Sequence, residues 1–291
     1  MGGLGNQLFQ IFTTMAISIK TKDTFMIPYN LHGGTRTRTY WDTLLKELKN
    51  NLTTIPFNNM KLPVYKENGF KYNKIQLPGD IVKKSGGVIL YGYYQSYKYF
   101  ENEYSKISEY IKLDENRQSV RDMYFADIET NANANANANA STENITISLH
   151  FRIGDYKVLQ DCHPIMDIEY YKNSIKFIVD KLSTSASITI LYFCEKEDAK
   201  IVKSKVEILK KHYPFIVFKC ADGESKIEDW QQILLMSCCQ HNIIANSSFS
   251  WWGAYLNNNP NKIVCYPRKW FGPKLPQHDI KDLCPPTWQI I

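Results

Sequence analysis

Short apolar runs and longer amphipathic stretches alternate along the second half of the chain. The short runs are rich in β-branched residues, as strands buried on both faces are, and the longer stretches carry apolar residues at i, i+3 and i+4, as helices do. This alternation predicts a parallel sheet covered by helices. The predicted strands are 147–152, 187–194, 215–220, 242–246 and 262–267, and the predicted helices are 166–182, 197–212, 227–240 and a short helix from 249.

The first half of the chain has a less regular pattern. Its apolar spacing predicts helices over 7–20 and 40–48 and a strand over 87–93. The aromatic stretch that follows this strand fits either the edge of a mixed core or a platform on which sugars stack, because buried and exposed tyrosines look alike in sequence. Its members are Tyr94, Tyr97, Tyr99, Phe100 and Tyr104.

A run of five Asn-Ala repeats, residues 131–140, separates the two halves. Such a segment buries too little apolar surface to order itself. We therefore expect a first domain over 1–130, a linker or loop over 131–143, and a second domain over 144–291. A length of 291 residues agrees with two domains.

Composition and charge narrow the class of protein. A chain that is 44% hydrophobic is not disordered as a whole, and its seven cysteines show no paired framework, which favours a reducing compartment. The sequence has no signal pattern and no membrane-helix pattern. We expect a soluble, cytoplasmic protein, with peripheral membrane contact left open. The net charge of +6 comes from scattered basic residues, which favours a phosphate-bearing ligand over nucleic acid.

The first candidate motif is Gly2-Gly3-Leu4-Gly5-Asn6-Gln7, directly before an apolar helix. Glycines here would let the backbone approach a ligand closely, and the two amides bring neutral donors and acceptors to the helix start. The motif is neither a dinucleotide fingerprint nor a phosphate loop, since Leu8 replaces the third glycine and no Gly-Lys-Ser/Thr follows. A ligand loop and a plain structural turn both stay open.

The second motif, residues 150–156, reads His-Phe-Arg-Ile-Gly-Asp-Tyr at the end of an apolar strand. Strand alternation places His150 and Arg152 on one face. A guanidinium at a strand end matches phosphate oxygens in a bidentate way, so Arg152 is a candidate diphosphate clamp. A structural ion pair between Arg152 and Asp155 is the alternative.

The third motif, residues 246–253, reads Asn-Ser-Ser-Phe-Ser-Trp-Trp-Gly between a strand and a short helix. Its serines can cap the helix, and the backbone N–H groups there can bind an anion. Capping alone would account for the serines, and core packing is expected for at least one of the two tryptophans.

A metal site is not expected. Cys238, Cys239 and His241 are close in sequence but have no second pair at zinc-finger spacing, so core packing is the better interpretation. No Asp-x-Asp pair is present to hold a divalent cation on a nucleotide. The pattern favours a metal-free site without a cofactor, in which Arg and helix amides neutralise the charge of the ligand.

Together and in order, the three motifs closely resemble those of the alpha-1,2-fucosyltransferases of glycosyltransferase family 11. The resemblance implies an α/β GT-B fold, in which two Rossmann-like domains face a cleft. It also implies an inverting, metal-independent transfer of fucose from GDP-fucose to a galactose hydroxyl of a glycan acceptor. The first half would bind the acceptor and the second half the donor.

The resemblance also implies roles for single residues. Arg152 would hold the diphosphate, His150 and Asp155 would orient the same motif, and Asn6 would lie across the cleft near the transferred sugar. Asp155 is the one motif carboxylate and thus the candidate general base, a weak or absent base being the alternative. Donor binding would involve Asn246, Ser247, Ser248, Phe249 and Ser250, and the acceptor side or cleft would involve Gly3, Gly5, Gln7 and Tyr156.

Three departures from the family pattern accompany the resemblance. Only Met1 precedes the glycine-rich turn, so the first family strand is expected to be missing, and Ile153 stands where many members have a second Arg. Residues 194–197 read Cys-Glu-Lys-Glu instead of a family Ser-Asp-Asp element. A GT-B transferase with another donor or linkage therefore stays an alternative, as does a silent nucleotide- or glycan-binding protein.

Overall fold

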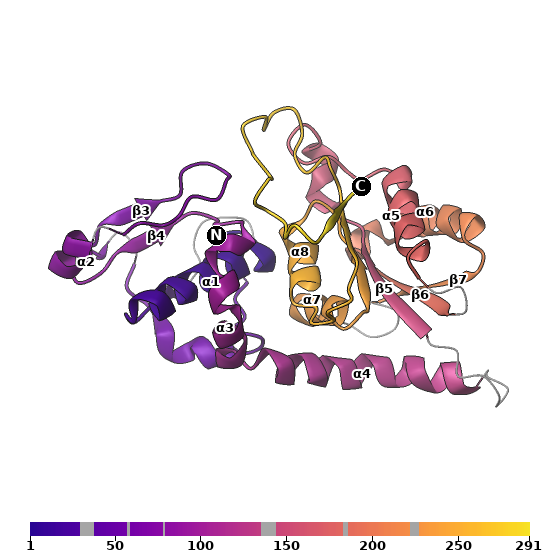
Figure 1. Cartoon of the computed structure of the whole chain (residues 1–291), viewed down its shortest axis with the longest axis horizontal. Helices are drawn as coiled ribbons and strands as arrows, with labels where there is room; N and C mark the ends of the chain where they lie inside the picture. The colour runs from indigo at the N-terminus through magenta and orange to yellow at the C-terminus, as the bar shows by residue number, and fades with distance from the viewer. Residues whose placement is uncertain (30–37, 57–58, 78, 135–143, 183–185, 222–226) are drawn as a thin grey trace. The chain divides into compact units, whose positions relative to one another are not determined.

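The computed structural model describes residues 1–29, 38–56, 59–77, 79–134, 144–182, 186–221 and 227–291, which form two compact units (Figure 1). The first unit is Met1–Asp114 together with Gln277–Pro285. The second unit is Glu115–Pro276 together with Pro286–Ile291. The chain thus returns to its first unit near the C-terminus before it ends in the second.

The boundary between the units differs from the predicted one. It lies near the start of helix α4 (Leu113–Ala134) rather than at residue 130. Arg117 explains why this helix belongs to the second unit: its buried guanidinium donates to the Leu256 carbonyl at 2.6 Å and to Ser237 Oγ at 3.4 Å. The helix continues over 131–134, where a linker was expected, because alanine strongly favours helix. Residues 135–143 of the expected linker lie outside the described residues.

Local bonds explain why Gln277–Pro285 belongs to the first unit. The Lys98 ammonium lies 2.5 Å from the Asp282 carboxylate, and Ser96 Oγ donates to the Asp282 carbonyl at 2.5 Å. The rings of Phe70 and His278 are 5.1 Å apart. Contacts between residues so far apart in sequence leave no local pattern, so the sequence did not indicate them.

The second unit contains a six-stranded, all-parallel sheet in the order β10-β9-β8-β5-β6-β7. The predicted α/β class and its parallel sheet are confirmed. Strand β5 is central and pairs with both β6 and β8, so the carboxyl ends of these three strands meet at one edge. The strands are β5 (Asn144–His150), β6 (Ser187–Phe193), β7 (Ile216–Cys220), β8 (His241–Ile243), β9 (Val264–Tyr266) and β10 (Gln289–Ile290).

Helices cover both faces of this sheet. Alternate residues of β5, among them Ile147 and Leu149, pack into a core with α5 (Ile168–Val179) and α6 (Ala199–His212). Helices α7 (Asp229–Ser237) and α8 (Ser248–Tyr255) lie on the opposite side (Figure 1). On that side Ser148 accepts a hydrogen bond from Asn242 Nδ2 at 2.7 Å. The central strand therefore buries apolar residues on one face and a polar row on the other.

The first unit has helices and short strands. Helix α1 (Leu4–Thr21) confirms the predicted helix at 7–20. Two parallel pairs follow, formed by β1 (Ile27–Pro28) with β2 (Leu52–Thr53) and by β3 (Val64–Lys66) with β4 (Ile89–Tyr91). Its described residues also form α2 (Gly79–Ser85), α3 (Tyr104–Tyr110) and short 3-10 helices over Lys46–Asn51, Tyr97–Tyr99 and Glu101–Glu103.

The predicted helix over 40–48 is wrong. This segment forms successive turns that lead into the 3-10 helix, with i to i+3 bonds such as Lys46 N to the Thr43 carbonyl at 3.2 Å. Consecutive tight turns bury the same i, i+3 and i+4 positions as an α-helix does, and Trp41, Leu44, Leu45 and Leu48 are all buried. The apolar spacing therefore could not separate the two structures.

The aromatic stretch after β4 belongs largely to the core. Tyr94, Tyr99 and Phe100 are buried, and the rings of Tyr94 and Tyr99 meet edge to face at 5.4 Å. The core interpretation therefore holds for these three residues. Phe100 also packs against Phe12 of α1, at 5.6 Å between ring centres.

Two properties concern the molecule more broadly. The seven cysteines, all within the described residues, form no disulfide. Of the helices in the described ranges, none is both long enough and apolar enough to cross a membrane.

Candidate functional site

Polar residues follow three neighbouring strands of the second unit at their carboxyl ends. Arg152 and its turn follow β5, Glu195 and Asp198 follow β6, and the serine-rich turn follows β8. In open parallel sheets ligands bind beyond this edge. The candidate site is therefore the group of residues around Arg152 at this edge, called here the Arg152 cluster.

Arg152 has two acidic partners. Its Nη1 donates to Glu195 and its Nη2 to Asp155, while its guanidinium lies 4.8 Å from the ring centre of Tyr156. Burial opposes the charged form of Arg152, yet the two carboxylates hold its pKa above the ordinary value. The Arg152–Asp155 ion pair considered from the sequence is present, and a second carboxylate accompanies it.

The turn after β5 is held from the β6 side. Gly154 donates its backbone N–H to Asp198 Oδ2 at 2.6 Å, and Lys157 Nζ lies 2.5 Å from Asp198 Oδ1. Sequence reasoning missed Glu195, Asp198 and Lys157. The one available signal was the acidic segment at 194–197, which departed from the family pattern but had no visible partner.

Tyr156 links the turn after β5 to the turn after β8. Its hydroxyl donates to the Asn246 carbonyl at 3.0 Å, and its ring stacks on His163 at 5.0 Å. Together with the contact to Arg152, these bonds place Tyr156 inside the second unit's cluster. Its observed contacts are those of a bracing residue, and the acceptor-side or cleft role that the resemblance implies stays a prediction.

His150 ends β5 and is buried. Burial, and then the charge of Arg152, lowers the pKa of His150 to about 3, so the imidazole is neutral at physiological pH. Its ring lies 5.6 Å from that of Phe249. Its Nδ1 is buried and has no hydrogen-bond partner in the described part of the chain. Its place in the cluster agrees with an orienting role better than with proton transfer.

The serine-rich turn begins helix α8. Ser247 is the N-cap, and its Oγ accepts from the Phe249 N–H at 3.3 Å. Ser250 is buried and donates to the Ser247 carbonyl at 3.5 Å, and Ser248 and Phe249 are half-buried. Capping is thus confirmed for Ser247, while the helix N-terminus is directed at the same edge of the sheet as Arg152.

Asn246 and the two tryptophans have structural contacts. Asn246 Nδ2 donates to the carbonyls of Pro164 at 2.9 Å and Trp270 at 3.0 Å, which ties two loops to the end of β8. Trp251 and Trp252 are fully buried. Core packing, expected for at least one tryptophan, therefore applies to both.

The glycine-rich motif lies in the first unit, whereas the Arg152 cluster comes entirely from the second. Gly3 is the N-cap of α1, and Gly5 lies in its first turn. Gln7 is buried and donates to the carbonyls of Gly2 at 3.1 Å and Arg38 at 3.0 Å, so it closes the turn. Asn6 Oδ1 accepts from Gln95 Nε2 at 2.8 Å.

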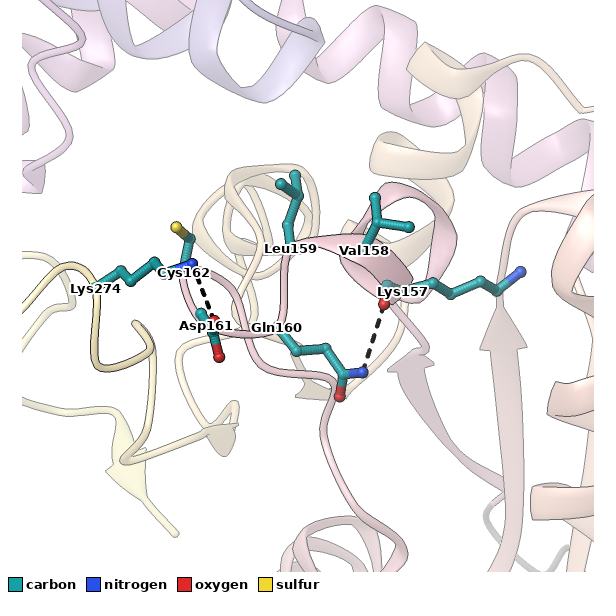
Figure 2. Close-up of a pocket in the computed structure, with 7 residues that line it drawn as sticks. All are labelled: Lys157, Val158, Leu159, Gln160, Asp161, Cys162 and Lys274. Carbon is teal, nitrogen blue, oxygen red and sulfur yellow. Dashed lines mark hydrogen bonds and ion pairs between the residues drawn. The ribbon is translucent and has the colours of Figure 1, made fainter.

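A pocket of about 220 Å³ lies beside the Arg152 turn (Figure 2). Lys274 closes one side through an ion pair with Asp161 at 3.0 Å. Figure 2 shows the Val158 and Leu159 side chains pointing the same way, and both are exposed. The lining residues are Lys157, Val158, Leu159, Gln160, Asp161, Cys162 and Lys274.

Of the two cysteines near His241, Cys239 packs in the core, as expected, and Cys238 is half-buried. Cys239 is buried, and His241 Nδ1 accepts the Ile263 N–H at 3.0 Å. Within the described ranges, no group of three or more His, Cys, Asp or Glu side chains is placed to hold a metal ion. Ile153, which replaces a second Arg of the family pattern, is buried in the core against α5.

Comparison with known proteins gives consistent relatives. The chain is 28% identical over 93% of its length to the O-antigen biosynthesis glycosyltransferase WbnK of Escherichia coli, of which the match covers 93%. It is 27% identical over 99% of its length to an alpha-1,2-colitosyltransferase of Escherichia coli, of which the match covers 95%. Among solved structures, a mutant of Arabidopsis thaliana FUT1 in complex with GDP aligns with 91% of this chain and 68% of its own, at 11% identity and a TM-score of 0.47.

The family assignment rests on more than single relatives. The model of glycosyl transferase family 11 matches residues 1–271, which include all three motifs. This chain therefore belongs to glycosyltransferase family 11.

Proposed function

We propose that this protein transfers L-fucose from GDP-fucose to a galactose hydroxyl of a glycan, forming an α-1,2 linkage with inversion and without a metal ion. The observation that carries the proposal is Arg152, whose side chain is only 11% exposed at the carboxyl edge of a parallel sheet in a chain of family 11. The N-terminus of α8 lies at the same edge. A guanidinium and a helix N-terminus are the groups that bind a diphosphate without a cation.

The chemistry of the reaction suits these groups. The bond between sugar and diphosphate breaks through an oxocarbenium-like state, and negative charge grows on the leaving diphosphate. Preorganised donors aimed at that charge lower the barrier more than they stabilise the bound substrate. Arg152, fixed by Glu195 and stacked on Tyr156, is preorganised in this sense.

The diphosphate would exchange with one carboxylate partner of Arg152. The Asp155 side chain is 52% exposed and that of Glu195 36%, so Asp155 is the partner more open to replacement. In this proposal the donor releases Asp155 from its ion pair. Asp155 then becomes available to accept the proton of the galactose hydroxyl as it attacks.

A second donor is a specific alternative, because one relative is an alpha-1,2-colitosyltransferase. Colitose is fucose without one ring hydroxyl, and GDP is the shared leaving group of the two sugar nucleotides. A site that hydrogen-bonds the extra hydroxyl discriminates against the deoxy sugar, whereas an apolar site does not. The two donors must therefore be compared side by side.

The test is GDP release from each donor with a panel of galactosides in the presence of a chelator. We expect release from GDP-fucose, and we expect Arg152→Ala to lower kcat/KM by about a hundredfold or more, because a transition-state charge loses its cation. Arg268→Ala, which removes an exposed guanidinium of the same unit, is the matched control and should retain activity.

Three outcomes would contradict the proposal. Release from GDP-colitose alone would move the activity to the second donor. GDP binding without turnover on any acceptor would identify a silent binding protein. Full activity in a folded Arg152→Ala variant would remove the clamp.

A further inference from the structure

The segment after β6 makes structural contacts with the donor site that the proposed function does not explain. It reads Cys-Glu-Lys-Glu-Asp over residues 194–198. Two of its acidic side chains reach the turn after β5. Glu195 binds Arg152, and Asp198 binds the backbone N–H of Gly154. One short segment thus contacts the clamp and the turn that follows it.

Asp198 is fully buried, although it is a carboxylate. A buried charge is costly unless it is paired and hydrogen-bonded. Oδ2 accepts the Gly154 N–H at 2.6 Å, and Oδ1 lies 2.5 Å from Lys157 Nζ. Asp198 therefore holds both Gly154, the first residue of the turn, and Lys157, three positions later.

The turn that Asp198 holds begins at Gly154 and lies close to Arg152. Gly154 has a φ of +31°, which a residue with a Cβ rarely adopts. A Cβ at this position would collide with Glu195 Oε2 and approach Arg152 Nη1 to 3.3 Å. The next residue, Asp155, binds Arg152 Nη2. The direction of the guanidinium thus depends on the path of this turn.

We propose that Asp198 is a positioning residue of the donor site. It fixes the Gly154 turn, so that Arg152, held by Glu195, is already in place when the diphosphate of the donor replaces Asp155. The inference rests on the proposed function, since it takes a nucleoside diphosphate as the ligand. It gives a role to Asp198, the residue that follows the departure from the family pattern at 194–197, and to Glu195 within that departure.

The experiment compares Asp198→Ala and Asp198→Asn with the wild-type protein. Ala removes the hydrogen bond to Gly154 and the ion pair with Lys157, whereas Asn keeps an oxygen that can accept the Gly154 N–H. Asp180→Ala is the matched control, because it removes a carboxylate that pairs with Lys176 at 2.7 Å on an exposed face of the same unit. Two quantities are measured, namely the GDP dissociation constant by calorimetry and the hydrogen-exchange rate of the Gly154 amide.

Asp198→Ala should weaken GDP binding and speed Gly154 exchange by about tenfold each, the equivalent of one charged hydrogen bond. Asp198→Asn should recover most of both, and Asp180→Ala should stay within about twofold of wild type, as exposed pairs contribute little. A purely structural role would lower the Tm of Asp198→Ala and leave the GDP affinity of the folded protein unchanged.

If Asp198→Ala does not fold, Gly154→Ala displaces the turn from the opposite side while leaving the Asp198–Lys157 pair intact, and it should weaken GDP binding by about tenfold too. The inference is overturned if either variant folds and keeps the wild-type GDP affinity. It is also overturned if Asp198→Ala loses GDP affinity while the exchange rate of the Gly154 amide stays unchanged. If wild-type protein fails to bind GDP, the donor assignment fails instead, and Gly154 exchange still decides whether Asp198 holds the turn.

Discussion

Two buried histidines of the second unit make its stability depend on pH. Burial lowers the pKa of His150 to about 3 and that of His241 to about 4, from an ordinary value of 6.5. At a pH between the folded and the ordinary pKa of each histidine, the unfolded chain binds a proton that the folded protein does not bind. Stability is therefore complete above pH 6.5 and falls as the pH is lowered towards the folded values.

This gives a prediction for His241. From pH 6.5 to pH 5 each histidine should cost about 2 kcal/mol of unfolding free energy. His241→Asn keeps an acceptor for the Ile263 N–H but cannot titrate, so it should remove about half of that combined loss. Urea unfolding followed by tryptophan fluorescence measures it. His212→Asn, at the exposed end of α6, is the control, and an equal change there would contradict the assignment.

Residue-level predictability depended on whether the partners of a residue lie within its own motif. The Arg152–Asp155 pair could be considered from sequence because the two residues are three positions apart. Glu195 and Asp198 could not be assigned to the same site, since they reach it from a neighbouring strand. The amide nitrogens of Asn246 and Gln7 tie loop carbonyls together, and the expected ligand or cleft contacts of these two residues stay a prediction.

At the scale of elements, α8 is the helix whose position matters most to the candidate site. Its N-cap, Ser247, follows β8, and its far half packs against α7. Gly253 marks this contact: a Cβ there would lie 2.7 Å from Met236 Cβ and 2.8 Å from its sulfur. The glycine of the third motif is therefore explained by close helix packing.

Gly253→Ala should separate α7 from α8. Overpacking of this kind costs about 1–3 kcal/mol, which thermal or urea denaturation can measure. Because α8 would shift at its packed end, GDP affinity should fall together with stability. Ala substituted for Gly79, where a Cβ meets nothing within 4 Å, is the control. A Gly253→Ala variant as stable as wild type would show that the packing can yield.

Elements of the second unit were predictable because each has a strong period and a clear end. The strands and helices from β5 to β9 lie within the predicted segments or close to them. The first unit was harder: the turns over 40–48 imitate helical spacing, and its strands are only two or three residues long. The Asn-Ala segment was predicted to be a linker or loop, but its first four residues continue α4.

At the scale of the whole molecule, the sequence predicted two units but not their bounds. Their composition depends on contacts made far along the chain, such as Arg117 with Leu256 and Asp282 with Lys98. Most of the net charge of +6 belongs to the first unit, whereas Arg152, the cation of the candidate site, belongs to the second. The low exposure of its side chain, 11% between two carboxylates, distinguishes it from the exposed lysines.

The central claim is the identity of the sugar transferred and of the bond formed. The most direct measurement is two-dimensional NMR of the product made from GDP-fucose and a galactose-terminated acceptor. We predict an α-linked fucose whose anomeric proton correlates with carbon 2 of galactose. A β-linked product, a bond to another carbon, or a product formed only from a different sugar nucleotide would contradict it.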